Sequence, residues 1–495
     1  MINPTLIGIA LVVALGGFVY GVDAGIIATT LAHDTFKYAM LGPTGVNAGL
    51  TGAIVSLYNV GQAIGTFGAG YSANKYSRRW TICASAIIAI VGAALQSGAV
   101  NAGMMIAGRF FAGVGCGILL AVVPTYIAEI SPPEHRGKIV GLQGMMMAIG
   151  FFAANWIGYG GAYAKGDAQW RIPLAMQIPG PLALAVGCCF IPYSPRWLIG
   201  QERHEEAHAV LMKLNRDPNA VARDLNNIME HIQTEATQTS GVKESLTKLV
   251  SRQYLHRTVM ACFLLIMGQF SGSSVIQNYQ SSFYAAVGFT GKSSLLISGV
   301  YGIMGVIGQV IYLFITADRW PRSRTLWVGS LFLSVMIAIC MALSAQYGDS
   351  DTPNISGARA AIAMIFLYSC GYAVFFNATI WVVPSEILPF ALRATGMGLA
   401  VFCKSVSAIV LSQITPTALE NVGWRYYSLF IATNLAAAVV YFFWLPETSG
   451  KTLEEIAEIF GDPAPAEYEM KDSVETELKS ANVKRSSSSH VENIA

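Results

Sequence analysis

Twelve long apolar runs constrain the fold of this chain more than any other feature of its sequence. Each run is long enough, at about 1.5 Å per residue in a helix, to cross a hydrocarbon layer of about 30 Å. The sequence therefore predicts an all-α membrane protein with twelve transmembrane helices. The expected spans are residues 5–30, 51–73, 80–100, 103–130, 139–163 and 172–192, followed by 258–287, 293–317, 325–346, 359–388, 394–416 and 424–445.

The polar stretches divide the chain into four parts. Residues 1–192 form an N-terminal six-helix half, and residues 193–257 are polar, with charge patterning typical of short amphipathic helices. Residues 258–445 form a C-terminal six-helix half. Residues 446–495 form a tail rich in Lys, Glu and Ser, which we expect to be mostly disordered.

The composition agrees with a lipid environment. Hydrophobic residues make up 54% of the chain and charged residues 12%, against about 25% charged in soluble domains. The net charge of +2 gives no reason to expect a nucleic-acid partner. The eight cysteines lie in apolar runs without a Cys-x-x-Cys spacing, so we interpret them as packing residues and expect no metal site. The first apolar run lacks a basic flank and a cleavage site, which predicts a retained helix.

The lysines and arginines of the short loops predict the orientation. They cluster on one side, for example at Arg78 with Arg79 and at Arg322 with Arg324, and are scattered on the other side. Because cytoplasmic loops carry the excess of positive charge, the connector and both termini are expected to be cytoplasmic. The sequon at Asn354 then falls in an outer loop and is a candidate glycosylation site.

Three polar motifs occur once in each set of six helices. Residues 74–79 and 318–322 follow the second helix of each set, residues 129–136 and 386–393 end the fourth, and residues 194–197 and 446–450 follow the sixth. These matched places indicate a duplicated unit. Two such halves, related by an axis along the membrane normal, are typical of major facilitator transporters, whose substrate site lies between the halves near the midplane.

Taken together, the motifs resemble those of the sugar porter family of the major facilitator superfamily, including fungal-type hexose transporters. Residues 16–25 resemble its GGFxxGxDxG, residues 108–110 its GRF, residues 133–137 its PExxRG, residues 194–198 its SPRWL and residues 446–455 its PETxGxTLEE. The resemblance runs from the first helix to about Asp462. It implies a transporter rather than an enzyme, which imports a sugar or sugar-like solute across the plasma membrane by alternating access, as a monomer without a cofactor.

Several positions depart from the family pattern. The acidic residue after the second helix is Asn74 here, and the glycine that follows in the family is Ser77. The glutamine pair of the fifth helix reads Gln143-Gly144, and an asparagine of the eleventh helix is replaced by Lys404. We therefore expect the transport machinery to be kept, whereas the substrate-contacting residues are changed.

Asp23 and Arg109 are charges inside apolar runs. They lie about 10 Å and about 12 Å deep from the same side, so we expect them to pair. A charge at this depth costs about 2.5–3.5 kcal/mol on insertion scales and marks a functional candidate. An aspartate at this place in the family marks proton-coupled members. The pair is therefore a candidate for proton coupling, and a purely structural ion pair is the alternative.

Polar side chains near the midplane are candidates for binding the solute. They offer hydrogen bonds and one flat apolar surface, which suits a ring bearing hydroxyls. Hydrogen bonding between helices explains the same residue types equally well. The candidates are Gln143, Gln269, Ser273, Ser274, Asn377, Trp381 and Lys404.

Lys404 lies about 16 Å from the start of its helix, beyond the reach of about 6 Å of its side chain. Three explanations stay open. Lys404 pairs with Asp23, or it attracts an acidic substrate such as a sugar acid or a quinate-like molecule, or it is neutral and donates a hydrogen bond to a neutral sugar.

Charged residues at the cytoplasmic helix ends are candidates for a gate. Their duplication suits salt bridges between the halves that close the cytoplasmic side, although solvated anchors are the alternative. Tyr279 resembles the family's aromatic gate on the outer side. The cytoplasmic candidates are Arg78, Glu129, Arg136, Asp318, Arg322, Glu386 and Arg393.

Two other functions share this fold. A facilitative sugar uniporter would need no proton, and the aspartate at position 23 argues against it. A transporter-like nutrient sensor would signal through a long cytoplasmic tail, and the stretch after the last helix is short for that role.

Overall fold

The computed structural model describes residues 4–131, 136–214, 221–222, 225–226, 228–229, 242–285, 288–316, 319–347, 355–389, 392–449 and 459–460. Helices dominate these residues, and no strand occurs among them. Eight segments, some of them two helices that run on across a break, are long and apolar enough to cross a membrane. Asp318, Asn354, the side chain of Arg136 and most of the tail lie outside the described residues.

The first half consists of helices α1 to α8. Its long helices match the predicted spans within a few residues, and a short helix, α2, lies in the loop between the first two. The elements are α1 (Pro4–Thr30), α2 (Asp34–Met40), α3 (Ala48–Tyr76), α4 (Arg78–Ser97), α5 (Ala102–Ile130), α6 (Arg136–Gly161), α7 (Ala168–Ala175) and α8 (Pro179–Cys188).

The second half consists of helices α13 to α20. A π-helical turn, Tyr312–Thr316, extends α15, and a 3-10 turn, Gly423–Tyr426, precedes α20. The elements are α13 (Leu255–Phe270), α14 (Ser273–Ala285), α15 (Gly291–Ile311), α16 (Arg322–Tyr347), α17 (Ile355–Phe375), α18 (Thr379–Ile387), α19 (Arg393–Val422) and α20 (Tyr427–Phe443).

Three predicted spans, 172–192, 258–287 and 359–388, are not single helices, because each contains a break between two helices. Pro179 starts α8 because it lacks a backbone N–H and suits a first helical position. Gly272 separates α13 from α14 with φ of 95°. The carbonyl oxygen of Ser271, freed from the helix, accepts hydrogen bonds from Tyr368 Oη at 2.9 Å and Asn434 Nδ2 at 3.0 Å.

Glycines let α5 lie in close contact with its neighbours. A Cβ atom at Gly113 or Gly117 would come within 2.2 or 2.3 Å of a backbone oxygen of α3, and one at Gly115 within 2.7 Å of a backbone oxygen of α4. These glycines therefore serve helix packing. The close contact holds α5 rigidly between α3 and α4, with Arg109 on it.

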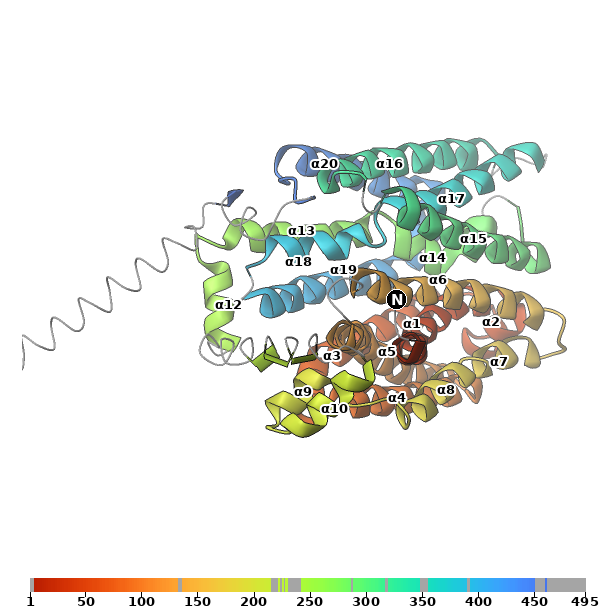
Figure 1. The fold of residues 1–495 in the computed structure, drawn as a ribbon. Coiled ribbons are helices and arrows are strands. Elements are labelled where there is room, and N and C mark those ends of the chain that lie inside the picture. Colours follow the sequence, from red (N-terminus) through yellow and green to blue (C-terminus); the bar gives the residue numbers. More distant parts are fainter. Residues whose placement is uncertain are drawn as a thin grey trace, which may run out of the picture.

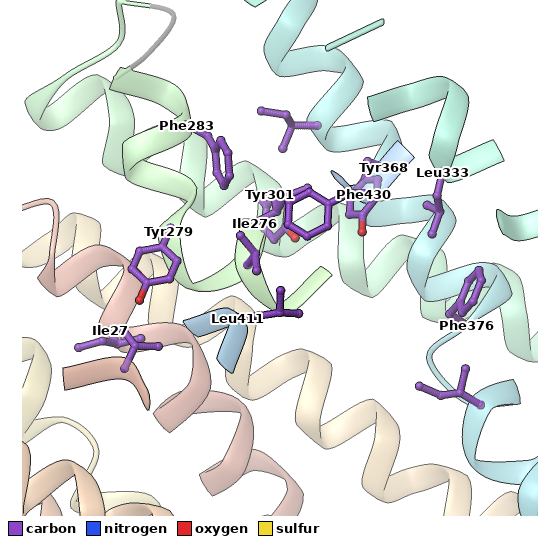
Figure 2. Packing of buried hydrophobic residues seen from close by; sticks show 14 of the residues in the cluster. Ile27, Ile276, Tyr279, Phe283, Tyr301, Leu333, Tyr368, Phe376, Leu411 and Phe430 are labelled. Atoms are coloured by element: carbon purple, nitrogen blue, oxygen red, sulfur yellow. The ribbon is translucent and has the colours of Figure 1, made fainter. Parts of the chain in front are cut away.

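The connector helices α9 (Pro195–Gly200), α10 (His204–Leu214) and α12 (Val242–Val250) lie at one end of the bundle, and α2 lies at the other (Figure 1). We call these the connector end and the α2 end. The two halves meet where α3 packs against α19 and α6 packs against α15. One buried apolar cluster joins the second half to residues of the first half near the α2 end, including Ile27 (Figure 2). A separate cluster fills the first half toward the connector end.

Candidate functional site

Asp23 on α1 and Arg109 on α5 form a buried ion pair. Nη1 of Arg109 lies 3.6 Å from Oδ1 of Asp23, and the two residues are 1% and 4% exposed. The guanidinium also donates to the backbone oxygens of Asp23 at 3.3 Å and Ile54 at 3.4 Å. The contact that depth along the two helices predicts is therefore present, with both charges withdrawn from the surface of the bundle.

Two further side chains complete this ion-pair site, and the sequence interpretation missed both. Sγ of Cys116 donates to Oδ2 of Asp23 at 3.2 Å, and the guanidinium of Arg109 lies 4.3 Å from the ring centre of Tyr58. Cys116 follows Arg109 by two helical turns, so the same face of α5 presents both. That spacing was the available signal. The sequence held no comparable signal for Tyr58, because its contact with Arg109 depends on how α3 packs against α5.

The break between α13 and α14 carries part of the predicted binding set. Gln269 lies near the end of α13, and its Oε1 accepts a hydrogen bond of 2.6 Å from Oγ of Ser274 at the start of α14. Ser273 is buried beside it, and its backbone N–H donates to Oγ of Ser271 at 3.4 Å. Polar side chains thus hold the two helices together across the break.

A second break, between α17 and α18, carries Asn377. Its Nδ2 donates a 2.7 Å hydrogen bond to Oε1 of Gln309 on α15, a buried glutamine that the sequence interpretation missed. A Cβ atom at Gly144 on α6 would lie 3.8 Å from Nε2 of Gln309, so the first half reaches this pair. Gln143, next to Gly144, is buried and packs against Gly17 on α1. The signal missed for Gln309 was a polar residue in the middle of an apolar run.

Lys404 lies in the middle of α19 and contacts Trp381 on α18. Its Nζ is 5.1 Å from the ring centre of the tryptophan, and the residue is 9% exposed. Nζ makes no ion pair or hydrogen bond with the described residues. Pairing with Asp23, one of the three explanations for this lysine, is absent from this conformation, because Asp23 is engaged by Arg109 and Cys116.

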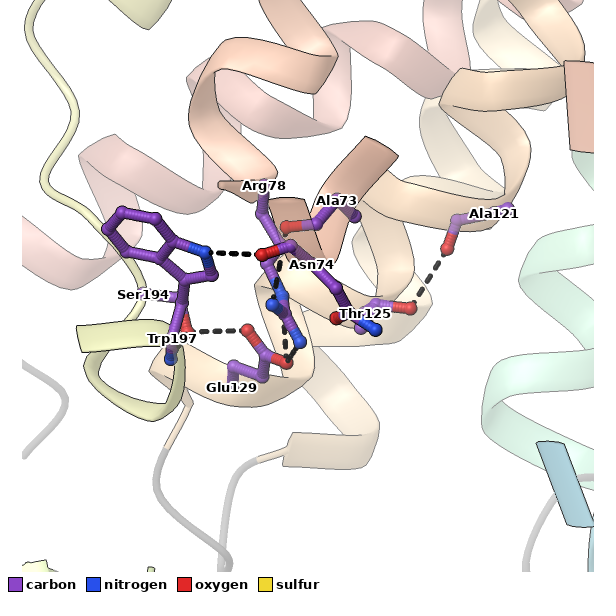
Figure 3. Close-up of polar contacts among 8 residues, drawn as sticks. All are labelled: Ala73, Asn74, Arg78, Ala121, Thr125, Glu129, Ser194 and Trp197. Atoms are coloured by element: carbon purple, nitrogen blue, oxygen red, sulfur yellow. Dashed lines mark hydrogen bonds and ion pairs between the residues drawn. The ribbon is translucent and has the colours of Figure 1, made fainter. Parts of the chain in front are cut away.

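Glu129, at the connector end of α5, is the centre of a polar network (Figure 3). Its Oε1 accepts from Nη2 of Arg78 at 2.9 Å and from Nε at 3.2 Å. Oε2 accepts a hydrogen bond from Oγ of Ser194, which precedes α9 and also accepts from the Trp197 backbone N–H. Three motifs of the first half therefore meet at one carboxylate.

The second half repeats this network. Glu386 on α18 lies 3.8 Å from Nη2 of Arg322, and its Oε2 accepts a 2.6 Å hydrogen bond from Oγ1 of Thr448. The pairs of Glu129 and Glu386 thus join helices within one half, and no ion pair between the halves occurs among the described residues. The expected bridges between the halves at this end stay a prediction for another conformation. Arg393 donates to the backbone oxygen of Leu388 at 3.5 Å.

Hydrogen bonds between the two halves gather toward the α2 end. They connect α3 with α19 and α6 with α14. The pairs of side chains are Ser56 Oγ to Gln413 Oε1 at 2.8 Å, Asn59 Nδ2 to Ser412 Oγ at 3.0 Å, and Gln280 Nε2 to Asn155 Oδ1 at 2.8 Å. The halves are therefore joined at this end.

Tyr279 lies where α14 is kinked, close to these contacts. Its φ and ψ of −117° and 20° depart from helical values, and its hydroxyl donates to the backbone oxygen of Ser412 at 2.6 Å. The ring is 1% exposed and points toward Ile27 of the first half (Figure 2). The residue thus sits at the boundary between the halves, and its role as a gate stays a prediction.

Comparison with known proteins gives one consistent result. The sequence profile of the sugar (and other) transporter family matches residues 9–460. The MFS-type transporter criB of Aspergillus cristatus is 33% identical, over 92% of this chain and 94% of its own. The high-affinity glucose transporter of Kluyveromyces lactis is 28% identical over 92% and 85%, and a probable quinate permease of Aspergillus clavatus is 28% identical over 91% and 87%.

Solved structures show the same fold. The xylose transporter XylE of E. coli in its inward-open conformation superposes with a TM-score of 0.76 at 22% identity, over 92% of this chain and 99% of its own. XylE bound to 6-bromo-6-deoxy-D-glucose gives 0.75 at 22% identity, over 92% and 100%. With the family profile matched over most of its length, this chain belongs to the sugar (and other) transporter family, the sugar porters of the major facilitator superfamily, and is a transporter and not an enzyme.

Proposed function

We propose that this protein imports a small sugar-like solute across the plasma membrane together with a proton, by alternating access. Two of the relatives described above are named as a glucose transporter and a quinate permease, which supports a small polyhydroxylated solute. XylE, which shares the fold, is named as a proton:xylose symporter. The connector end is the cytoplasmic end in this proposal, because the loops on that side hold most of the positive charge.

The observation that carries the proposal is the buried pair of Asp23 and Arg109. The contact is 3.6 Å long, and the two residues are on different helices, α1 and α5. A proton on Asp23 removes its attraction to Arg109, so protonation and the separation of the two side chains are coupled. Such a coupled pair can take up a proton in one conformation and release it in the other.

The arrangement of the halves supports alternating access. The hydrogen bonds that join them lie toward the α2 end, whereas the networks of Glu129 and Glu386 at the connector end lie within one half each. Two six-helix units, residues 1–192 and 258–445, would rock about the region between them. The breaks before α14 and α18 give this motion places to bend, since helix interruptions absorb changes in backbone angle.

The test is uptake by the full chain in proteoliposomes under an imposed pH gradient, with labelled glucose and labelled quinate. Asp23→Asn should abolish accumulation against a gradient but keep exchange of labelled for unlabelled solute, because exchange needs no change of protonation. Asp34→Asn is the control, since Asp34 is exposed at the α2 end and pairs with Lys37.

Each other outcome is informative. If Asp23→Asn still accumulates solute and still acidifies the vesicle interior, proton coupling through Asp23 is wrong. If the unaltered protein only equilibrates the solute, it is a facilitative uniporter. Binding of solute without any flux would instead favour a nutrient sensor.

A further inference from the structure

Lys404 differs from Arg109, the other cation deep within the helices of the bundle, because no anion pairs with it among the described residues. Arg109 lies 3.6 Å from the carboxylate of Asp23. Lys404 is similarly enclosed, with 9% of its surface exposed, yet its Nζ forms no ion pair or hydrogen bond with the part of the chain that the structure describes. Its one described polar contact is the face of Trp381, 5.1 Å from Nζ.

The aromatic contact does not complete the environment of this ammonium. A tryptophan face offsets only part of the cost of removing an ammonium from water, and a buried cation ordinarily has a hydrogen-bonded anion. The side chain does not reach either end of its helix, because Arg393 and Val422 begin and end α19 at about 16 Å and about 27 Å from it. An ion-pair partner for a charged Lys404 therefore has to come from outside the described residues.

The protein itself offers no such anion in the described residues. Asp23 has one carboxylate oxygen facing Arg109 and the other accepting from Cys116. Nζ of Lys404 makes no hydrogen bond and is not among the fully enclosed polar atoms that lack a partner, so part of its surface remains accessible. An accessible ammonium inside the bundle is suited to a ligand from solution.

Other polar residues at the helix breaks of the second half limit the ligand further. Asn377 lies in the break four residues before Trp381, and its amide is joined to that of Gln309. Gln269 lies on α13, which packs against α19. Amide groups and one flat ring surface match a compact molecule that bears hydroxyls. One lysine without an arginine suits a single negative charge, whereas phosphate sites commonly combine several cations or a bidentate arginine.

We infer that the solute is a hydroxylated monocarboxylate, with its carboxylate on Lys404 and its apolar face against Trp381. The inference rests on the proposed transport function and deepens it by naming the substrate class. Gluconate and quinate have the required chemistry, and gluconamide and the methyl ester of quinate are their neutral counterparts.

The experiment uses proteoliposomes that contain the full chain. It measures the uptake of each of the four compounds, or the ability of each to compete for uptake. The charged member of each pair should be preferred by about tenfold or more, as a charge-assisted hydrogen bond in an enclosed site implies. Lys404→Asn should collapse this ratio, and Lys404→Arg should keep most of it. Lys292→Asn is the control, because Lys292 lies at the start of α15 against the ring of Tyr163.

Thermal unfolding of the unaltered protein gives a measurement that needs no variant. Gluconate should raise the melting temperature more than gluconamide at the same concentration, since only the state that binds the ligand is stabilised. Equal transport and equal stabilisation by both members of each pair would overturn the inference while leaving the transport function intact. If Lys404→Asn lost uptake of the charged and the neutral compound equally, Lys404 would have a structural role and the inference would also be overturned. Absence of any uptake by the unaltered protein would reject the proposed function itself.

Discussion

The thiol of Cys116 donates a hydrogen bond to the carboxylate of Asp23, with 3.2 Å between Sγ and Oδ2. Arg109 faces the other oxygen of the same carboxylate at 3.6 Å. Both donors project from one face of α5, whereas Asp23 belongs to α1. The charge on Asp23 therefore ties α1 to α5, and loss of that charge on protonation weakens two contacts at once.

We predict that Cys116→Ala lowers the free energy of unfolding by about 1–3 kcal/mol, because a buried charged oxygen loses its donor. Cys116→Ser should lose less, since a hydroxyl also donates. Cys188→Ala is the packing control, as Cys188 is fully buried and has no such contact. Thermal unfolding in detergent measures the difference. Equal melting temperatures for the Ala and Ser variants at position 116 would contradict the role of the hydrogen bond.

The sequence predicted which charged residues lie at the same level along their helices, and it predicted other contacts less well. The rise of a helix fixes depth, which is why Asp23 and Arg109 were expected to pair and do so. Which neighbour a side chain meets depends on helix rotation and on backbone contact, as at Gly113, and these are set by packing. Cys116 and Gln309 were missed for that reason. The break at Gly272 was missed because the freed carbonyl oxygen of Ser271 accepts hydrogen bonds from helices distant in the sequence.

Ser77 gives a second prediction, because it adopts a backbone conformation that favours glycine. Its φ and ψ are 78° and 154°, between α3 and α4, and it is fully buried. A residue with a side chain in this region costs about 1–3 kcal/mol, whereas glycine adopts it freely. Ser77→Gly should therefore stabilise the protein by about 1–2 kcal/mol, since the weak 3.5 Å hydrogen bond from the Trp80 N–H to its Oγ contributes little.

The matched control for this prediction is Ser72→Gly. Ser72 lies within α3, where glycine is unfavourable, so this variant should lower stability by about 0.5 kcal/mol. Melting temperatures of both variants decide the matter. A lower melting temperature in both Ser77→Gly and Ser72→Gly would show that the conformation of Ser77 is not strained.

The closed α2 end gives a third prediction. Nε2 of Gln280, which is fully buried, donates to Oδ1 of Asn155 across the two halves at 2.8 Å. Asn155→Ala leaves that amide without its acceptor only in the closed state, at a cost of about 1–2 kcal/mol. The population open at the α2 end should rise by about 5- to 30-fold.

This shift is measurable by chemical labelling. Ser281 is buried on α14, next to Gln280 at the boundary between the halves. Ser281→Cys should therefore react with a membrane-impermeant maleimide from the α2 side mainly when the halves part. Asn155→Ala should speed that reaction. Asn434→Ala is the control, because Asn434 bonds within the second half. An unchanged labelling rate in Asn155→Ala would exclude a role of this bond in closing the α2 end.

The last prediction joins Asp23 and Lys404. Over a complete cycle both side chains return to their starting charge, so the charge moved is that of the proton plus that of the solute. A monocarboxylate with one proton moves no net charge, whereas a neutral solute with one proton moves one positive charge. A potential of 100 mV is equivalent to about 2.3 kcal/mol per charge, which is about fifty-fold in accumulation at equilibrium.

Proteoliposomes with a fixed pH gradient and a membrane potential set by potassium and valinomycin would measure how accumulation depends on the potential. Accumulation of gluconate should not respond to the potential, and any accumulation of gluconamide should increase when the interior is negative. A response of gluconate as large as that of gluconamide would mean that two protons accompany each carboxylate, and the pairing of one proton on Asp23 with one anion on Lys404 would be wrong.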